Sequence, residues 1–267
     1  PDFRAFADLY DRGRTDNMAG DAILDLYHFT RALPHPAASL AAFAAMWQQD
    51  APPKDTLWGK ELLGIALARA QGAKTLLEGG PAIAARDEAA DRAYTAVMQD
   101  DAARVKNLCY YLKKGDWDKS LAALDAVLTG WRRAGSVKGG KDANQCASAA
   151  SQLRDRAKDQ MTSLQKDVLL CTAEEFAADR RRAAPLVAAL VRATQAFADS
   201  CFAAKCAEKV LDYADYEHLT LDLLLTESNE RTPLCATVSA RYAAVLVDEY
   251  QDTNALQDAI YFALARP

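Results

Sequence analysis

Residues 145–168 read QCASAASQLRDRAKDQMTSLQKDV, and this stretch is the clearest indication of the fold class. Its apolar side chains recur in steps of three and four, which is the period of one face of an α-helix. The spacing is also that of a coiled-coil seam, so we predict a long helix packed against other helices. The seam positions are Cys146, Ala150, Leu153, Ala157, Met161, Leu164 and Val168.

The composition of the whole chain extends this helical prediction. The chain has 267 residues, and alanine, the strongest helix former, makes up roughly a fifth of them. An all-β domain needs turn residues about every ten positions, and 12 glycines and 9 prolines are too few for that. Hydrophobic residues at 51% and charged residues at 26% exclude a disordered or collagen-like chain. We therefore expect an all-α fold.

Charge, cysteines and hydropathy limit the ligands and the compartment. The net charge of −5 excludes a uniformly basic nucleic-acid binder but leaves room for a local basic face. No apolar run approaches about 18 residues, so we predict no membrane span and no membrane partner. The six cysteines form no CxxC pair and the three histidines lie far apart, so we predict free thiols, no zinc site and a cytoplasmic location.

Proline, glycine and capping residues predict where the helices begin and end. Thr172 and Glu175 match a capping box, so a new helix is expected to start there. Pro185 fits an early position in another long helix that runs toward Leu225. Breaks in the helical pattern are expected at 34–36, 52–53 and 79–81.

One short run near the C-terminus departs from the helical pattern. Residues 243–247 (AAVLV) are apolar and partly β-branched, and they stop abruptly at Asp248 and Glu249. This pattern predicts a fully buried strand of a parallel sheet. A lone strand cannot satisfy its own backbone groups, so its partners lie elsewhere in the chain, where none is visible, or outside it. Asn254 and Gln257 then predict a capped helix.

Acidic residues at the tip of such a strand have a recognised chemistry. They lie where α/β folds bind ligands, and an Asp followed by a Glu fits a Walker B arrangement. The Asp holds the Mg²⁺ of a bound nucleotide, which prefers hard oxygen ligands, and the Glu polarises the attacking water. The pair Asp248 and Glu249 alone is a weak signal, but ten consecutive fitting residues, 245–254, are a strong one.

Residues 245–257 (VLVDEYQDTNALQ) resemble motif II of the UvrD/Rep superfamily-1 helicases. Residues 211–221 (LDYADYEHLTL) are similar to the segment that precedes motif II in that family, and Glu217 and His218 within them point to the AddA family of helicase–nuclease subunits. The N-terminus is also similar to AddA, in Phe6-x-x-Leu9-Tyr10 followed by 13–16, in 23–29 and in 34–36. Packing is the alternative interpretation of 211–221, and a helix cap is the alternative interpretation of Gln257.

The resemblance implies roles for four residues of motif II. Asp248 would be the Mg²⁺ ligand and Glu249 the catalytic base, while Gln251 and Asp252 would couple the nucleotide to neighbouring motifs. Mg²⁺ and ATP are the cofactors expected in the full-length protein. The expected protein partner is an AddB-like subunit.

The resemblance further implies an internal fragment that ends just past motif II. We expect a helical 1B-like subdomain over 1–205 and a partial 1A motor subdomain over 206–267, whose one short buried strand is a remnant of the RecA-like motor domain. Residues 135–141 fit the spacing of a Walker A loop, but Asp142 stands where Ser or Thr is needed and a helix precedes them, so we expect a surface loop. The fragment alone is expected to bind no cofactor, to hydrolyse no ATP and neither to unwind nor to cut DNA.

A locally basic stretch is the other candidate site. Residues 101–166 hold 13 lysines and arginines against 7 aspartates and glutamates. Phosphate contacts from such a stretch give salt-dependent, non-sequence-specific DNA binding, and the 1B subdomain of UvrD-like helicases touches the duplex ahead of the motor. A solvated helix surface is the alternative. The candidates are Lys113, Lys114, Arg132, Arg133, Lys138, Lys141, Arg154, Arg156 and Lys158.

The predicted function is that of a bacterial ATP-dependent 3′-to-5′ DNA helicase and exonuclease that acts, as one subunit of a complex, in double-strand-break repair and recombination. This piece of it would contact duplex or junction DNA. The alternative is a non-enzymatic α-helical scaffold or protein-interaction module whose acidic end is a coincidence. No repeat at a period of about 34–47 residues is visible, which argues against a solenoid scaffold.

Overall fold

The computed structural model describes residues 2–10, 17–226 and 228–265. The chain forms two compact units, a central unit over 49–180 and a terminal unit made of 1–48 and 181–267. The regular structure of the described residues is helical, apart from one isolated bridge between Leu225 and Arg231, which confirms the all-α prediction. The unit boundaries differ from the predicted 205/206 boundary because the two ends of the chain fold together.

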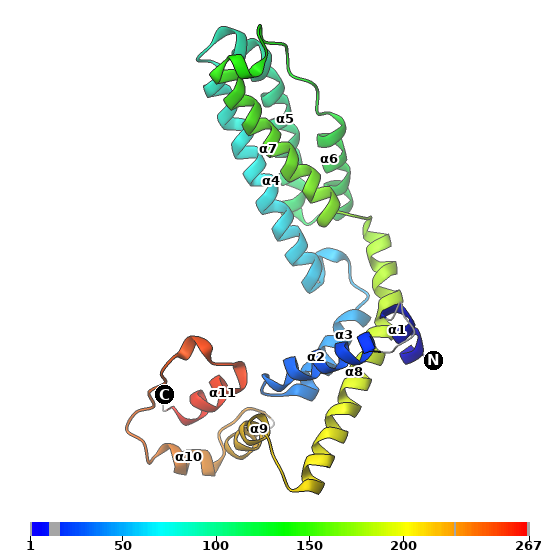
Figure 1. Ribbon diagram of the computed structural model, residues 1–267, viewed down its shortest axis with the longest axis vertical. Coiled ribbons are helices and arrows are strands. Elements are labelled where there is room, and N and C mark those ends of the chain that lie inside the picture. Colours follow the sequence, from blue (N-terminus) through cyan, green and yellow to red (C-terminus); the bar gives the residue numbers. More distant parts are fainter. Residues whose placement is uncertain (1, 11–16, 227, 266–267) are drawn as a thin grey trace. The chain divides into compact units, whose positions relative to one another are not determined.

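The central unit is built from four helices (Figure 1). Helices α4, α5 and α7 lie side by side, and α6 packs against α5. Two single turns, η1 and η2, precede α4 and α7. The bounds are η1 Pro53–Asp55, α4 Leu57–Ala84, α5 Glu88–Lys114, α6 Trp117–Thr129, η2 Lys141–Ala143 and α7 Gln145–Asp167.

Alanine is a frequent residue in the core of the central unit. Ala66, Ala70 and Ala73 of α4 are fully buried at helical spacing, as are Ala150 and Ala157 of α7. Side chains this small let helix backbones approach closely while larger residues fill the remaining core. The predicted α7 seam is confirmed, since five of its seven positions are buried and the other two pack against the same core.

The predicted break at 79–81 is wrong, because α4 continues to Ala84. Gly80 is buried there, and a Cβ atom on it would collide with the Met98 side chain of α5. The glycine therefore serves a close helix contact rather than a turn. Pro81 lies within the last turn of the helix, and because it has no backbone N–H it donates no helical bond to the carbonyl of Leu77.

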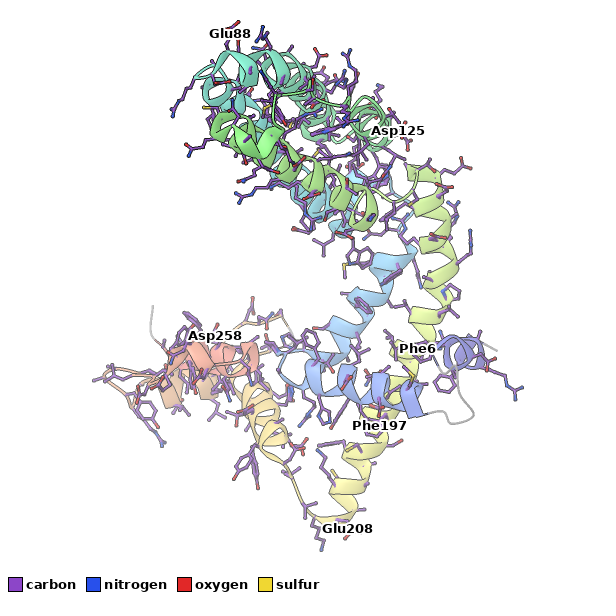
Figure 2. All side chains as sticks on the ribbon, turned by 45° about the horizontal axis from the view of Figure 1, so that its top comes forward. Phe6, Glu88, Asp125, Phe197, Glu208 and Asp258 are labelled. Atoms are coloured by element: carbon purple, nitrogen blue, oxygen red, sulfur yellow. The ribbon has the colours of Figure 1, made fainter. Side chains whose placement is uncertain are left out.

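The terminal unit gathers the remaining helices. Phe6 of α1 is buried against Leu186 and Leu190 of α8, and the rings of Tyr27 and Phe197 meet edge to face at 5.1 Å (Figure 2). Residues 13–16, which carry part of the resemblance, lie outside the described residues. The bounds are α1 Asp2–Tyr10, α2 Asn17–Arg31, α3 Pro36–Gln48, α8 Ala173–Glu208, α9 Tyr213–Leu224, α10 Pro233–Ser239, η3 Tyr250–Asp252 and α11 Ala255–Leu264.

Helix α8 begins in the central unit and continues into the terminal unit. Its capping box is confirmed, since the Thr172 amide donates to Glu175 Oε2 at 2.8 Å and the Glu175 amide donates to Thr172 Oγ1 at 3.2 Å. Pro185 lies inside this single helix instead of starting a new one, and the helix ends at Glu208 rather than near Leu225.

Length and composition alone would let α8 cross a membrane. No membrane span was expected, because no apolar run approaches about 18 residues. An 18-residue window of α8 is nevertheless apolar on average, with at most two charged residues. Core helices of soluble proteins pass the same test. Such core helices are mostly buried, whereas only 17% of the apolar window of α8 is buried, with Leu186 and Leu190 packed against the cluster of Phe6, Ala7 and Ala19.

The predicted strand at 243–247 is wrong. These residues have no regular secondary structure and form no ladder with any described residue. Leu246 is 93% exposed and Val245 is 37% exposed, so the run is not buried either. A strand requires neighbouring strands to take up its N–H and C=O groups, and the described part of the chain supplies none.

Candidate functional site

The four predicted residues of motif II lie on an exposed loop that follows 243–247 and leads into α11. The Glu249 backbone has φ 50° and ψ 41°, a left-handed conformation that is uncommon for a residue other than glycine. Its amide donates to Asp248 Oδ1 at 2.9 Å, and the Gln251 side-chain amide donates to the Glu249 carboxylate. The structure thus brings three of the four predicted residues into direct contact, and Asp252 follows in η3.

The loop ends in a helix whose cap was predicted. Asn254 Oδ1 accepts from the Gln257 amide at 2.8 Å, and the Gln257 side chain accepts from the Asn254 amide at 3.3 Å, so the capping box is confirmed. Gln257 Nε2 also donates to Glu217 Oε1 of α9 at 2.8 Å. The Tyr250 hydroxyl bonds Asp258, which raises the pKa of the tyrosine. Gln257 therefore both caps α11 and joins it to the segment 211–221.

A cluster of ion pairs fixes the start of α9. Asp215 is buried and accepts from Arg31 of α2 and from Lys205 of α8, each at 2.7 Å. Asp212 accepts from the same two cations and caps α9. Although burial works against ionisation, hydrogen bonds from Lys205 and backbone amides hold the pKa of Asp212 and of Asp215 below the usual range. Helices α2, α8 and α9 are joined at this point.

The end of α2 also contacts both α9 and α11. His218 Nε2 lies 3.2 Å from the carbonyl oxygen of Arg31, and the Leu256 amide donates to the carbonyl oxygen of Ala32 at 3.0 Å. Burial and the nearby Arg31 guanidinium lower the pKa of His218, so the ring is neutral at pH 7. The N-terminal segment, 211–221 and motif II are therefore neighbours. Sequence reasoning identified each segment but not the contacts of Arg31 and Lys205, which no local pattern marks.

The carboxylates of motif II suit one kind of metal site. Mg²⁺ at a nucleotide is held by one or two protein carboxylates together with phosphate oxygens and water. Asp248 and Glu249 are exposed and offer hard oxygen ligands on one loop, so they fit that requirement. Within the described residues no three His, Cys, Asp or Glu side chains converge as a self-contained metal cage. Any Mg²⁺ here would depend on a nucleotide for its remaining ligands.

The second candidate site is a groove of about 820 Å³ in the central unit. We call it the basic groove. Five cationic residues line it, and Asp155 is its only acidic lining residue among those described. Four of the five are exposed, so the structure brings together four of the nine predicted DNA contacts at the surface of one groove. The cationic lining residues are Arg132, Arg133, Lys141, Arg154 and Lys158.

Arg154 is the exception, because its side chain is only 7% exposed. Its Nε donates to Asp101 at 2.7 Å, its Nη2 donates to the Arg132 carbonyl oxygen at 2.6 Å, and its guanidinium lies over the Trp131 ring. These contacts commit Arg154 to the fold, so we correct its prediction as a DNA contact. It instead fixes the loop that carries Arg132 and Arg133.

The other cations of the groove differ in their partners. Arg132 pairs with Asp100, and Lys141 lies 3.1 Å from Ser151 Oγ and 3.6 Å from Asp155. Arg133 and Lys158 have no acidic partner among the described residues, so their charge is uncompensated. The groove therefore has a net positive field suited to a phosphate backbone.

The remaining predicted cations lie outside the groove. Lys138 is exposed on the loop beside it, and Arg156 is exposed on α7. Lys113 and Lys114 end α5, about 38 Å from the start of that helix at the usual rise. The predicted surface loop is confirmed over 135–140, which follows α6 rather than a strand, so it is not a Walker A loop.

Comparison with known protein families gives the class of protein to which the chain belongs. A family model for the UvrD/REP helicase N-terminal domain matches residues 83–267, and the chain belongs to this family.

Individual relatives are AddA proteins, which confirms the family predicted from the sequence. The chain is 30% identical to the ATP-dependent helicase/nuclease subunit of Levilactobacillus brevis over 99% of its length, and 30% identical to that of Moorella thermoacetica over 100%. It is 27% identical to the same protein of Desulforamulus reducens over 97%. The matched region is 21%, 19% and 21% of these relatives, so the chain spans about a fifth of their length.

Proposed function

We propose that the chain is the part of a bacterial ATP-dependent DNA helicase and nuclease that carries its Walker B carboxylates and a DNA-contacting helical unit. In this proposal the central unit is 1B-like and the terminal unit contains a 1A-like motor piece. The full-length protein would translocate 3′ to 5′ during double-strand-break repair, and its partner would be an AddB-like subunit. The chain's own contribution to the DNA would be the basic groove.

One observation carries the motor assignment. Two segments that resemble the helicase family, 211–221 and motif II, contact each other through Glu217 and Gln257. The Leu256 amide also donates to the carbonyl oxygen of Ala32, which lies between the matching segments 23–29 and 34–36. A chance match to motif II gives no reason for its helix to bond the second matching segment. The contact supports a shared role in placing the loop of Asp248 and Glu249.

The loop can perform two tasks at a nucleotide. Asp248 would hold the Mg²⁺, which shields the phosphate charge when bound. Glu249 would accept a proton from the attacking water. The side-chain amide of Gln251 donates a hydrogen bond to the Glu249 carboxylate and restrains it. Asp252 would couple this loop to neighbouring motifs of the longer protein. Each role needs the carboxylates to face solvent and a ligand, as their exposure allows.

The catalytic-base role is tested in the full-length protein by Glu249→Gln. The amide keeps the shape of the side chain but accepts no proton, so we expect ATP to bind normally and steady-state ATP turnover to fall by roughly 10²-fold or more. Glu230→Gln, an exposed glutamate outside the loop, is the matched control and should retain full turnover. If the Glu249→Gln protein hydrolyses ATP at the normal rate, the assignment is wrong.

The basic groove supports the DNA-contact role. Its cations project from a loop and a helix without a side-chain set arranged to read bases, which fits contacts to phosphates rather than to sequence. The rival function, a helical scaffold, would leave the uncompensated charges of Arg133 and Lys158 without a ligand. A scaffold would also show no salt-dependent affinity for DNA.

A further inference from the structure

A second pocket of the central unit lies where α5, α6 and η1 meet. It encloses about 510 Å³, within the roughly 300–1,000 Å³ range of small-ligand sites. Tyr110 in this pocket lies 16 positions along α5 from Tyr94 of the basic groove, so about 24 Å separates the two sites. The lining residues that matter here are Pro53, Lys54, Tyr110, Tyr111, Lys114 and Trp117.

Two tyrosine rings give the pocket an aromatic wall. The rings of Tyr110 and Tyr111 lie 5.3 Å apart at 75°. Lys114 Nζ lies 5.8 Å from the Tyr110 ring centre, and Lys119 Nζ lies 5.9 Å from the Tyr111 ring centre. Tyr110 is 55% exposed, so its ring is accessible to a ligand. Its ring offers a stacking surface directly beside a cation.

Specific backbone and side-chain contacts hold the floor of the pocket in place. Gly115 ends α5 with φ 67°, a conformation that glycine adopts without strain. A Cβ atom there would lie 3.3 Å from Lys54 Cβ, so the glycine also lets η1 approach the α5–α6 turn. Trp117 is 4% exposed and its indole N–H donates to the Cys171 carbonyl oxygen at 2.8 Å. The walls are therefore held in place before any ligand arrives.

The charges of the pocket leave a positive surplus. Asp116 pairs with Lys119 at 2.8 Å and caps α6, while Asp118 accepts from the Ala173 amide at 2.8 Å. Both carboxylates are thus committed to the fold. Lys54 and Lys114 line the same pocket and form no ion pair with an acidic side chain among the described residues. An anion beside the tyrosine wall would meet both ammonium groups.

We propose that this pocket binds an unpaired nucleotide of a single-stranded nucleic acid. The base stacks on Tyr110, and the adjoining phosphate lies between Lys54 and Lys114. This goes beyond the proposed function, because the basic groove takes duplex phosphates and contacts no base. A free nucleoside triphosphate is the competing ligand, and displacement by ATP in the experiment below distinguishes it. A proline-rich peptide would use the aromatic wall but not the two lysines.

The proposal is tested with the 267-residue chain and a short oligothymidylate that carries one 2-aminopurine. Binding should quench the 2-aminopurine fluorescence, because the base stacks. Loss of one stacked base costs about 1–3 kcal/mol, so Tyr110→Ala should raise the Kd about 5- to 150-fold and abolish the quenching. Tyr110→Phe keeps the ring and should bind normally. Lys114→Ala should weaken binding without abolishing the quenching.

Matched controls separate the pocket from general effects. Tyr213→Ala removes an exposed tyrosine of the terminal unit and Lys106→Ala removes an exposed lysine of α5 outside the pocket, so both should bind normally. Thermal unfolding of each variant confirms its fold. Unchanged binding by Tyr110→Ala would overturn the proposal, as would displacement of the oligonucleotide by ATP alone at equal concentration. Tyr110-dependent binding of an oligoproline peptide without binding of the oligonucleotide would overturn it in favour of a peptide site.

Discussion

Asp101 and Arg154 form a buried ion pair in the central unit. Asp101 also accepts from Arg104 at 3.1 Å, and Arg154 reaches the Arg132 carbonyl oxygen. Removing one member of a buried pair leaves the other charged and without solvent. The stability of the loop that carries Arg132 and Arg133 therefore depends on this pair.

Asp101→Ala should lower the free energy of unfolding by about 3–5 kcal/mol, because Arg154 would stay buried without its anion. Asp100→Ala is the matched control, since its partly exposed pairs with Arg104 and Arg132 contribute at most about 1 kcal/mol. Urea unfolding followed by tryptophan fluorescence measures both. Equal losses for the two neighbouring aspartates would contradict a buried structural role for Arg154.

Individual side-chain roles divide into those that sequence could predict and those it could not. The roles of Asp248 and Glu249 could be predicted, because the residues that indicate them are consecutive in the sequence. Arg154 and Arg133 look alike in the sequence, since both are cations in one basic stretch. Arg154 is buried in an ion pair with Asp101, which lies 53 positions earlier in the chain, and Arg133 does not contact that aspartate. Charge counting cannot detect that partner.

Helix α4 carries its clearest constraint at its first turn. Gly59 is buried, and a Cβ atom there would overlap the carbonyl oxygen of Pro53 in η1. Its amide donates to Thr56 Oγ1 at 3.0 Å, so the helix start and η1 are locked together. Because the opposing atom belongs to the backbone, it has no rotamer into which to move.

Gly59→Ala should therefore lower the free energy of unfolding by about 1–3 kcal/mol. Gly64→Ala is the matched control in the same helix, since nothing lies within 4 Å of its added Cβ atom. The control should raise the free energy of unfolding by about 0.5–1 kcal/mol, because alanine restricts the unfolded chain. Thermal or urea unfolding of both variants checks the opposite signs. A stabilised Gly59→Ala variant would refute the close contact with η1.

Element prediction succeeded where the deciding residues are local. The α7 seam and the caps at Thr172 and Asn254 are patterns within a few positions, and each is confirmed. Element prediction failed where a contact with residues distant in the sequence determines the local structure. The Gly80 position depends on Met98 of another helix, and the run at 243–247 depends on neighbouring strands that the described residues do not contain.

At the scale of the whole molecule, the chain combines its two ends in one unit and its middle in another. The resemblance to UvrD-like helicases led us to expect one helical subdomain over 1–205. The contacts of Arg31 with Asp212 and Asp215 show instead that α2 belongs with α9. Such pairings span more than 180 positions and leave no periodic trace in the sequence.

The basic groove offers the most direct test of the proposed function, because the chain itself should bind duplex DNA there. A labelled duplex is titrated with the 267-residue chain over a series of salt concentrations, starting at about 50 mM. We expect log K to fall linearly with log[salt], and Arg133→Ala combined with Lys158→Ala to weaken binding and reduce that slope by about 2, since each phosphate contact contributes about 0.9.

The matched control combines Lys60→Ala with Lys166→Ala, which removes the same charge from exposed positions outside the groove. It should leave the slope within error of the unmodified chain. We predict duplex binding at low salt with a slope that depends on Arg133 and Lys158. Absence of binding at about 50 mM salt, or equal slopes for the groove variant and the unmodified chain, would contradict the proposed function.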